Sequence, residues 1–392
     1  MKILFLSFYF SPDLSAGSFR SGGLVDALLT GWSETVDIEV ITTLPNRYSS
    51  FSEEAPEVEK LPNLTIHRIK TPRHNSGMLD QSIAFFAYAK GVKKIIADHN
   101  YDLVYATSSR LMTAILGARV ARKLRTPLYL DIRDIFVDTI GDVLPYKLGR
   151  AVAPFFSILE RLTVTSADKV NLVSAGFLPY FQKRYPQHEF EVFTNGIDAQ
   201  FLEAKPKQSL EIKNGELTVV YAGNIGDGQG LHAILPELAL KFSGKLFFKV
   251  VGDGGRAQEL ASALRSSGCK NAVLLQPVKR DELIALYQSA DVLFLHLNDF
   301  DAFTKVLPSK VFEYAATGKP IWAGVAGYAA EFITSKIQNS AVFPPCNISA
   351  AVSSFDDLEI MTRHRKDFIN EFSRDRIMQK MARTLINFGQ KV

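Results

Sequence analysis

Clusters of glycines in the second half of the chain could hold a diphosphate. Two clusters follow successive apolar runs: Gly223, Gly226, Gly228 and Gly230 after one run, and Gly252, Gly254 and Gly255 after the next. Glycines leave backbone N–H groups unobstructed, and such groups can cradle a pyrophosphate. We expect both clusters to line one crevice. Their spacing matches neither G-x-G-x-x-G nor a P-loop, so the established nucleotide fingerprints do not apply.

A carboxylate follows a predicted helix start further along the chain. Pro308 and Ser309 predict that start. Free N–H groups and the positive end of the helix dipole would then lie at Ser309 and Lys310. Glu313 comes one turn later, near the same face. This spacing matches the distance from phosphate to ribose in a nucleotide and allows Glu313 to accept hydrogen bonds from ribose hydroxyls. The alternative is a solvated Lys–Glu pair on a helix surface.

The first half has its own loop of small residues, over 11–20, at the end of its first apolar run. Gly17 and Ser18 precede a helix predicted over 22–29. Backbone N–H groups at such a helix start can hold a phosphate, with Arg20 adding positive charge. The alternative is an ordinary tight turn.

Charged residues also follow a later apolar run of the first half. Asp131, Arg133 and Asp134 stand at the end of the run 128–132. They could orient an acceptor hydroxyl or balance charge in a cleft. A structural salt-bridge cluster fits the same residues equally well.

Metal-dependent and hydrolytic chemistry find no support in the sequence. The D-x-D pattern over 299–301 has no neighbouring metal ligands, and three residues match such a pattern easily by chance. The seven histidines have neither H-x-x-x-H nor triad spacing. Cys269 and Cys346 have no metal-ligand spacing and favour a reducing cytoplasm. We therefore expect no metal and no cofactor.

Apolar runs of four to eight residues are the elements that must position these loops. In the first half they are 3–10, 38–42, 64–69, 103–106, 128–132, 169–173 and 190–194, and in the second 217–223, 246–252, 273–275, 292–296, 321–324 and 341–343. Longer amphipathic segments alternate with them, as a parallel sheet covered on both faces requires. Two such series predict two Rossmann-like, doubly wound α/β domains.

The length of 392 residues exceeds one ordinary core and also favours two domains. A polar stretch over 199–216 ends in the turn signal Asn214-Gly215 and separates the two series. We place the first domain at 1–200 and the second at 201–373. The chain after Ile348 has a helical pattern, and a final helix over about 374–392 is expected to cross back to the first domain.

Composition is that of a globular protein, with 47% hydrophobic and 22% charged residues. No apolar run approaches the roughly 18–20 residues that span a bilayer. The first run ends without a cleavage site, which favours a buried strand over a signal peptide.

The net charge is +4, but residues 60–184 hold 19 Lys or Arg against 9 Asp or Glu. Such a stretch attracts nucleic acid, anionic lipid or a phosphorylated substrate, unless it is an ordinary solvated surface.

Taken in order, these segments resemble glycosyltransferase family four, the retaining enzymes of GT-B architecture. The resemblance covers nearly the whole chain. It is carried by the Gly17 loop, 131–134, Thr194-Asn195-Gly196-Ile197-Asp198, 223–231, 252–255 and 308–320. It implies two domains that face a central cleft, with an acceptor in the first and a nucleotide-sugar donor, UDP-linked by preference, in the second.

The chain departs from the family pattern in two places. The family usually has Arg and Lys in the loop after the first strand of the second domain, where Asn224 and Gln229 stand here. The first carboxylate of its two-glutamate motif is replaced by Lys305, so only Glu313 carries over. This combination is similar to enzymes of bacterial surface-polysaccharide and O-antigen assembly, including aminodeoxysugar transferases.

The resemblance implies a mechanism without a metal. Glu313 would bind the ribose, while the leaving diphosphate is neutralised by Ser309, Lys310, Gly17 and Gly226. Retention in the family is ascribed to front-side attack through an oxocarbenium-like state. Candidates to contact the donor sugar are Asp301, Phe303 and Lys305.

Two predicted helices of the first half combine basic and aromatic residues. The segment 82–99 has Lys90, Lys93 and Lys94 beside Phe85, Phe86, Ile95 and Ile96, and 147–164 has Lys147, Arg150 and Arg161 around Phe155, Phe156 and Ile158. This pattern suits an interfacial helix on anionic lipid, near a polyprenyl-diphosphate acceptor at the inner face of the cytoplasmic membrane. Core packing of the apolar residues is the alternative. Nucleic acid is not expected, because the basic residues alternate with buried-strand patterns.

Two other functions use the same fold. A nucleotide-sugar 2-epimerase would need acid–base carboxylates and histidines, which the histidine placement does not suggest. A non-catalytic GT-B subunit that scaffolds a partner would explain the replaced Arg, Lys and Glu.

Overall fold

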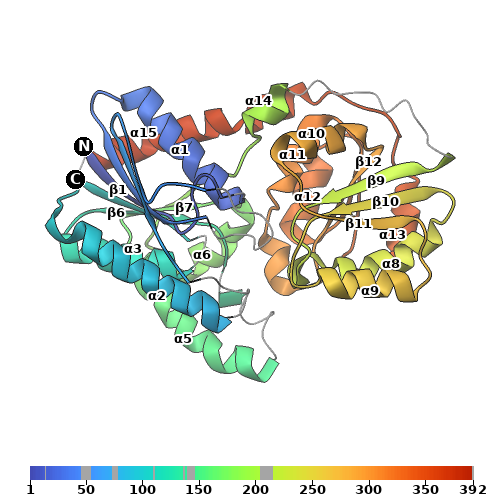
Figure 1. Ribbon diagram of the computed structural model, residues 1–392, viewed down its shortest axis with the longest axis horizontal. Coiled ribbons are helices and arrows are strands. Elements are labelled where there is room, and N and C mark those ends of the chain that lie inside the picture. Colours follow the sequence, from blue (N-terminus) through green and yellow to red (C-terminus); the bar gives the residue numbers. More distant parts are fainter. Residues whose placement is uncertain are drawn as a thin grey trace. The chain divides into compact units, whose positions relative to one another are not determined.

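The computed structural model describes residues 1–13, 15–45, 54–72, 78–108, 111–135, 137–138, 146–203 and 215–390. The chain divides into two compact units (Figure 1). Unit 1 comprises Met1–Asn195 with Arg374–Val392, and unit 2 comprises Gly196–Ser373. The polar stretch expected between the two domains lies mostly outside the described residues, and its described start forms α7 (Ala199–Glu203).

Within the described residues, unit 1 holds an eight-stranded sheet in the order β3-β4-β2-β1-β5-β6-β7-β8. The strands are β1 (Lys2–Leu6), β2 (Asp37–Thr43), β3 (Val58–Leu61), β4 (Leu64–Ile69), β5 (Leu103–Thr107), β6 (Leu128–Ile132), β7 (Lys169–Leu172) and β8 (Phe190–Val192). All neighbours pair in parallel except β3 and β4, which are antiparallel. The strand order reverses between β1 and β5, as in a doubly wound fold.

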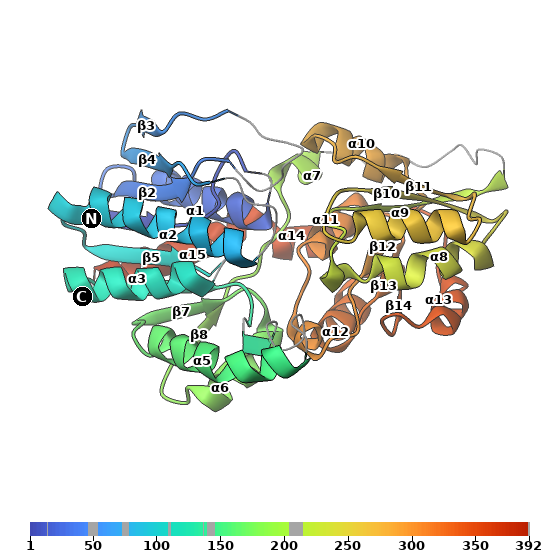
Figure 2. The same ribbon diagram turned by 60° about the horizontal axis from the view of Figure 1, so that its bottom comes forward.

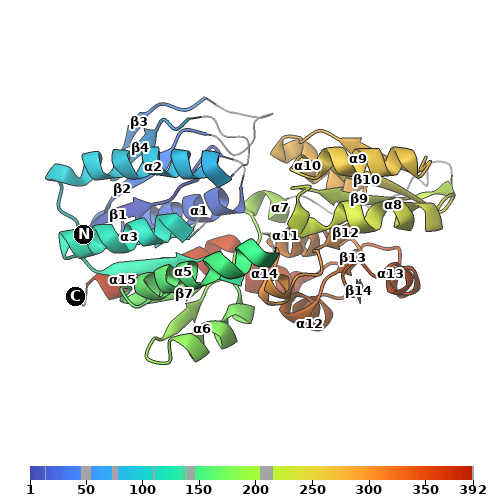
Figure 3. The ribbon, with the colours of Figure 1, turned by 90° about the horizontal axis from the view of Figure 1, so that it is seen from below.

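Helices cover both faces of this sheet. They are α1 (Ala16–Trp32), α2 (Met78–Ile95), α3 (Leu111–Leu124), α5 (Tyr146–Val164), α6 (Leu178–Arg184) and α15 (Arg374–Gly389). The last helix, α15, packs along α1, and a Cβ at Gly23 would lie 3.2 Å from Cδ of Arg374. The predicted return of the C-terminal helix to the first domain is therefore confirmed. On the other face, α2, α3 and α5 lie next to one another (Figure 3).

Unit 2 holds a parallel sheet of six described strands in the order β11-β10-β9-β12-β13-β14. The strands are β9 (Leu217–Ala222), β10 (Leu246–Val251), β11 (Ala272–Leu275), β12 (Val292–His296), β13 (Ile321–Gly324) and β14 (Ser340–Phe343). This is the Rossmann order, and it reverses between β9 and β12. The loops after these two strands are therefore where a ligand is expected.

Two layers of helices enclose the sheet of unit 2. They are α8 (Leu231–Lys241), α9 (Ala257–Ser266) and α13 (Ile348–Phe355) in one layer, and α10 (Arg280–Ser289), α11 (Lys310–Thr317) and α12 (Gly327–Lys336) in the other, with α14 (Lys366–Phe372) against α11. Burial on both faces explains why the strands are continuous apolar runs: every residue of β12 and β13 is buried.

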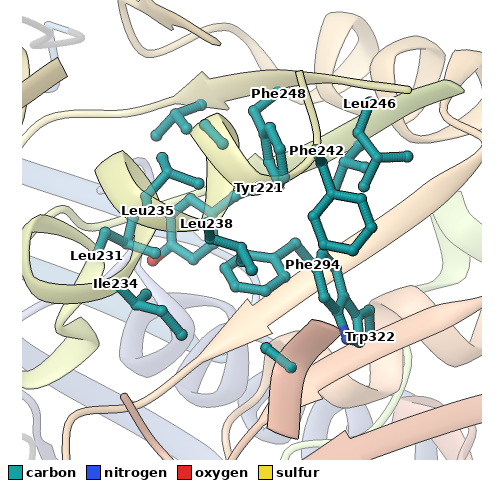
Figure 4. Close-up of a cluster of buried hydrophobic side chains, with 14 of the residues drawn as sticks. Tyr221, Leu231, Ile234, Leu235, Leu238, Phe242, Leu246, Phe248, Phe294 and Trp322 are labelled. Atoms are coloured by element: carbon teal, nitrogen blue, oxygen red, sulfur yellow. The ribbon is translucent and has the colours of Figure 1, made fainter. Parts of the chain in front are cut away.

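Aromatic and aliphatic side chains fill the layer between α8 and this sheet. Leu235 and Leu238 of α8 pack with Phe294 and Trp322 of the strands (Figure 4). The indole N–H of Trp322 donates to Ser354 Oγ at 3.1 Å, so its one polar group is satisfied inside the core.

Each predicted apolar run overlaps a strand, so the expected architecture is confirmed. One strand was missed. β3 lies at the outer edge of the sheet of unit 1 (Figure 2), and its side chains are exposed or half-buried. An edge strand of this kind has no buried face to impose an apolar pattern. No helix in the described ranges combines the length and the apolar character needed to cross a bilayer.

Candidate functional site

The glycine clusters of unit 2 meet where β9 and β10 end. Gly223 has φ 138° and Gly252 has φ 152°, and a Cβ at Gly252 would overlap the carbonyl oxygen of Gly223. A Cβ at Gly254 would lie 2.6 Å from the carbonyl oxygen of Ile225. Glycine is thus required for two backbones to approach this closely. Both clusters therefore lie together, and the crevice expected between them stays a prediction.

The amides of these glycines already have partners. The N–H groups of Gly223 and Gly252 donate to the carbonyls of Val251 and Leu275 at 2.8 and 3.0 Å. Two further glycine N–H groups donate to side chains: Gly226 to Gln229 Oε1 at 3.1 Å and Gly254 to Asp253 Oδ1 at 2.7 Å. Gly252 and Gly254 thus serve close backbone approach, and the expected contact of the glycine amides with a diphosphate stays a prediction.

Lys310 lies close to the end of β9. Its helix, α11, begins directly after Pro308 and Ser309, which confirms the predicted helix start. Lys310 Nζ donates to Tyr221 Oη at 2.9 Å and lies 4.4 Å from the centre of the Tyr221 ring. A Cβ at Gly223 would overlap this amine. Glycine at 223 therefore leaves room for the amine against the backbone at the end of β9.

Glu313 lies one turn further along α11 and is held by an arginine. Arg280 Nη1 donates to Glu313 Oε1 at 3.1 Å, and Arg280 Nη2 donates to Asp198 Oδ2 at 2.8 Å. The Glu313 side chain is only 12% exposed. Lys310 and Glu313 therefore have different partners, which excludes the alternative of a solvated Lys–Glu pair.

Asn224 and Gln229, which stand where the family usually has Arg and Lys, bind each other. Asn224 Nδ2 donates to Gln229 Oε1 at 2.7 Å. The same oxygen also accepts from the N–H of Gly226. Two uncharged amides thus close the loop after β9 upon itself, and neither adds positive charge beside Lys310.

His296, at the end of β12, fixes the other side of this loop. Its Nδ1 is 2.7 Å from the carbonyl oxygen of Gln229, and its Nε2 accepts from the N–H of Cys346 at 3.0 Å. These partners require the tautomer with the proton on Nδ1. Burial lowers the pKa of His296 to about 4, so the ring is neutral at pH 7. With a backbone partner on each ring nitrogen, His296 is a structural bridge between this loop and the chain at Cys346.

The residues expected to contact a sugar follow β12 on the short helix η5 (Asp301–Lys305). Phe303 lies over the glycine loop, because a Cβ at Gly228 would be 2.7 Å from Cζ of its ring. Asp301 is exposed and Lys305 is half-buried on the same short helix. All three thus belong to the carboxyl end of the sheet in unit 2.

In unit 1 the charged residues of 131–134 do not form one exposed group. Arg20 binds Asp131 through two bonds, Nε to Oδ2 at 2.8 Å and Nη2 to Oδ1 at 2.9 Å. Tyr105 and Asn171 donate to the same carboxylate at 3.0 and 2.7 Å. The exposed fractions of Arg20 and Asp131 are 1% and 0%. Burial opposes the charge, but the Arg20 guanidinium holds the pKa of Asp131 below its ordinary value.

These positions correct the expected roles of Arg20 and Asp131. Arg20 also donates to the carbonyl of Thr194 at 2.6 Å, so its guanidinium points into the fold and not at a phosphate. Asp131 cannot orient an acceptor hydroxyl from this depth, and the salt-bridge alternative holds. Arg133 is half-buried with Nη2 3.4 Å from Asn195 Oδ1, and Asp134 is exposed.

The loop of small residues before α1 is also shorter than expected. The helix starts at Ala16 because Ser15 caps it, accepting from the N–H of Ser18 at 3.1 Å. Gly17 and Ser18 are thus buried residues of the first helical turn. The helix start itself remains the feature of this loop that could attract an anion.

Three residues that shape the site were not singled out from the sequence: Tyr221, Arg280 and His296. Arg280 carries a detectable signal, because it is the first residue of α10 and a cation there opposes the helix dipole. Tyr221 carries a hydroxyl among the buried residues 219–222 of β9, and that hydroxyl needs a partner inside the fold.

The whole chain can be compared with known families. Residues 203–374 match the family model of "Glycosyl transferases group 1", and residues 25–196 match that of "Glycosyl transferase 4-like domain". The chain belongs to the group 1 glycosyltransferases. The resemblance to family four is confirmed at this level, and the protein transfers a sugar from a nucleotide.

Relatives and solved structures agree with this assignment. The chain is 24% identical over 397 residues to WcaI of Escherichia coli (strain K12), which is named as a colanic acid biosynthesis glycosyl transferase, and 93% of each chain is covered. Sucrose-phosphate synthase of Thermosynechococcus elongatus has a TM-score of 0.80 at 13% identity over 100% of both chains. HepE of Anabaena, solved with UDP-glucose, has a TM-score of 0.68 at 17% identity and covers 99% of this glycosyltransferase and 100% of HepE. These similarities establish the GT-B fold.

Replacing Asp131 by Asn should destabilise unit 1 of the glycosyltransferase by about 3–5 kcal/mol, because Arg20 would be left as a buried charge without its counter-ion. Asp98→Asn, at an exposed aspartate of unit 1, is the matched control and should change stability by less than about 0.5 kcal/mol. Urea unfolding followed by Trp32 fluorescence in a Trp322→Phe background reports on unit 1. Equal midpoints for both variants would contradict a structural role for the pair.

Proposed function

We propose that this glycosyltransferase moves a sugar from a nucleoside diphosphate, with UDP favoured, to a polyprenyl-diphosphate-linked or other glycan acceptor in bacterial surface-polysaccharide assembly. The observation that carries the proposal is the arrangement of Lys310 and Glu313 at the start of α11. HepE, solved with UDP and with UDP-glucose, supports uridine as the base. WcaI, named for colanic acid biosynthesis, supports a polysaccharide product.

The start of α11 offers a nucleoside diphosphate two points of attachment. An α-helix rises about 1.5 Å per residue, so Lys310 and Glu313 stand roughly 4.5 Å apart along the axis. Lys310 and the positive end of the helix, at Ser309, attract the diphosphate. The Glu313 carboxylate is an acceptor for ribose hydroxyls. Because Asn224 and Gln229 are uncharged, Lys310 carries more of the diphosphate charge than in relatives with Arg and Lys.

The same residues serve the chemical step. The bond between the sugar and the diphosphate breaks, and negative charge develops on the leaving oxygen. Lys310 and the helix dipole stabilise that charge, and we propose that no metal is needed. The acceptor hydroxyl attacks from the face that the diphosphate leaves, which retains the configuration, and its proton passes to the leaving phosphate. Asp301, Phe303 and Lys305 are proposed to contact the sugar.

Nucleotide binding is the first test. Among UDP, GDP, ADP and CDP, UDP should raise the melting temperature selectively, and Glu313→Ala should reduce that rise at least by half because a ribose acceptor is lost. Glu331→Ala, an exposed glutamate of α12, is the matched control and should respond like the wild type. No shift with any nucleotide would favour the non-catalytic scaffold instead.

Epimerisation is separated from transfer by leaving out the acceptor. A 2-epimerase converts UDP-N-acetylhexosamine alone, whereas a transferase leaves it unchanged until an acceptor is added. His296 supports transfer, because both of its ring nitrogens are bound to backbone groups and neither is left to move a proton on a substrate.

An exposed apolar face of unit 1 supports a membrane-bound acceptor. Phe86 of α2 is 69% exposed, and Phe155 and Ile158 of α5 are 60% and 59% exposed. Core packing accounts for the apolar side chains of Phe85 and Ile96, which are buried. It does not account for the three exposed side chains. The basic residues Lys90, Lys93, Lys94 and Arg161 are exposed on the same two helices, while the side chains of Lys147 and Arg150 lie outside the described part. We propose that this face rests on anionic lipid at the inner face of the cytoplasmic membrane.

The double substitution Phe155→Ser/Ile158→Ser should weaken binding to anionic vesicles at least about tenfold, because two large apolar side chains no longer enter the interface. Ile360→Ser, at an exposed apolar residue of unit 2, is the matched control and should bind like the wild type. Vesicle flotation at low salt measures both. Failure of the wild-type protein to float with anionic vesicles would contradict the membrane proposal.

A further inference from the structure

We propose that Arg280 is the positioning residue that orients Glu313 toward ribose, and that Asp198 in turn fixes Arg280. The inference rests on the proposed nucleotide site and identifies what makes that site selective for a nucleotide with ribose hydroxyls. All three residues belong to unit 2.

One guanidinium is shared between two carboxylates. Arg280 directs Nη1 to Glu313 and Nη2 to Asp198, at 3.1 and 2.8 Å. An arginine with a single carboxylate partner tends to take both of its oxygens in a forked pair. Because Asp198 takes the second nitrogen, Arg280 binds Glu313 through Oε1. The other oxygen, Oε2, is then the acceptor for a ribose hydroxyl.

An aromatic ring also packs against the guanidinium. Arg280 lies 4.6 Å from the centre of the Phe201 ring, in α7. That ring stacks on Tyr287 of α10 at 5.9 Å, and Tyr287 meets Tyr314 of α11 edge-on at 5.1 Å. Tyr314 follows Glu313 directly in the chain. The rings therefore connect the helix that carries the arginine to the helix that carries the carboxylate.

The position of Arg280 is unfavourable unless it has this task. It is the first residue of α10, where the positive end of the helix dipole opposes a cation. Two carboxylates from distant parts of the chain offset that cost: Asp198 lies 82 residues before Arg280, and Glu313 lies 33 residues after it. Stability of α10 alone would be served better by a neutral or acidic first residue.

The test compares nucleotides with and without ribose hydroxyls. Isothermal titration of UDP and of 2′,3′-dideoxy-UDP gives a ratio of dissociation constants for each protein. The wild type should prefer UDP at least about tenfold. Glu313→Gln and Arg280→Met should both bring this ratio below about threefold, while affinity for the dideoxy nucleotide stays near that of the wild type. Arg280→Lys, which keeps one contact, should give an intermediate ratio.

Two further variants make the outcome decisive. Asp198→Asn should lower the ratio in the same direction, because a neutral amide holds Arg280 less tightly than a carboxylate and Arg280 can then turn to take both oxygens of Glu313. This variant stands in if Arg280→Met does not fold. Arg265→Met, at an exposed arginine of unit 2, should leave the ratio unchanged. If Arg280→Met and Asp198→Asn kept the ratio of the wild type, with UDP and the dideoxy nucleotide weakened equally, the role of Arg280 would be overturned. The proposed nucleotide site would still stand. Absence of UDP binding by the wild type would overturn the proposed function itself.

Discussion

The close approach of two strand ends in unit 2 is the constraint on which the candidate donor site depends. A side chain at Gly252 would overlap the backbone of Gly223, and one at Gly223 would overlap the amine of Lys310. Without glycine at both positions, Lys310 could not lie against the end of β9. The strand order reverses at this strand, so the constraint falls at the point where an open α/β sheet binds its ligands.

Charge in the two units is arranged for different purposes. In unit 1 the Arg20–Asp131 pair is fully buried and bonded to Tyr105, Asn171 and the chain at Thr194, so it holds α1 to the sheet. In unit 2 Lys310, Arg280 and Glu313 are only partly buried. Charges that must meet a ligand have to stay within reach of solvent, whereas a buried pair repays its desolvation only through bonds inside the protein.

The pattern of the sequence was sufficient to predict the architecture and the helix that carries Lys310 and Glu313. A strand buried on both faces, such as Ile321–Gly324, is an apolar run, and Pro308 marks a helix start, so both were predictable. The hydrogen-bond partners of individual side chains were not predictable. Nothing local indicates that Arg20 turns inward to Asp131, 111 residues away, or that Arg280 reaches Glu313. The glycines were located correctly, but whether they expose an amide or admit a neighbouring backbone depends on the packing of a second loop.

A crystal structure of the protein with the nucleoside diphosphate that it binds would test the central claim most directly. The account predicts ribose hydroxyls within hydrogen-bond distance of Glu313 and a diphosphate against Lys310 Nζ at the start of α11, with Arg280 still bound to Glu313 and Asp198. A nucleotide bound away from the ends of β9 and β12, or a diphosphate that does not contact Lys310, would contradict it.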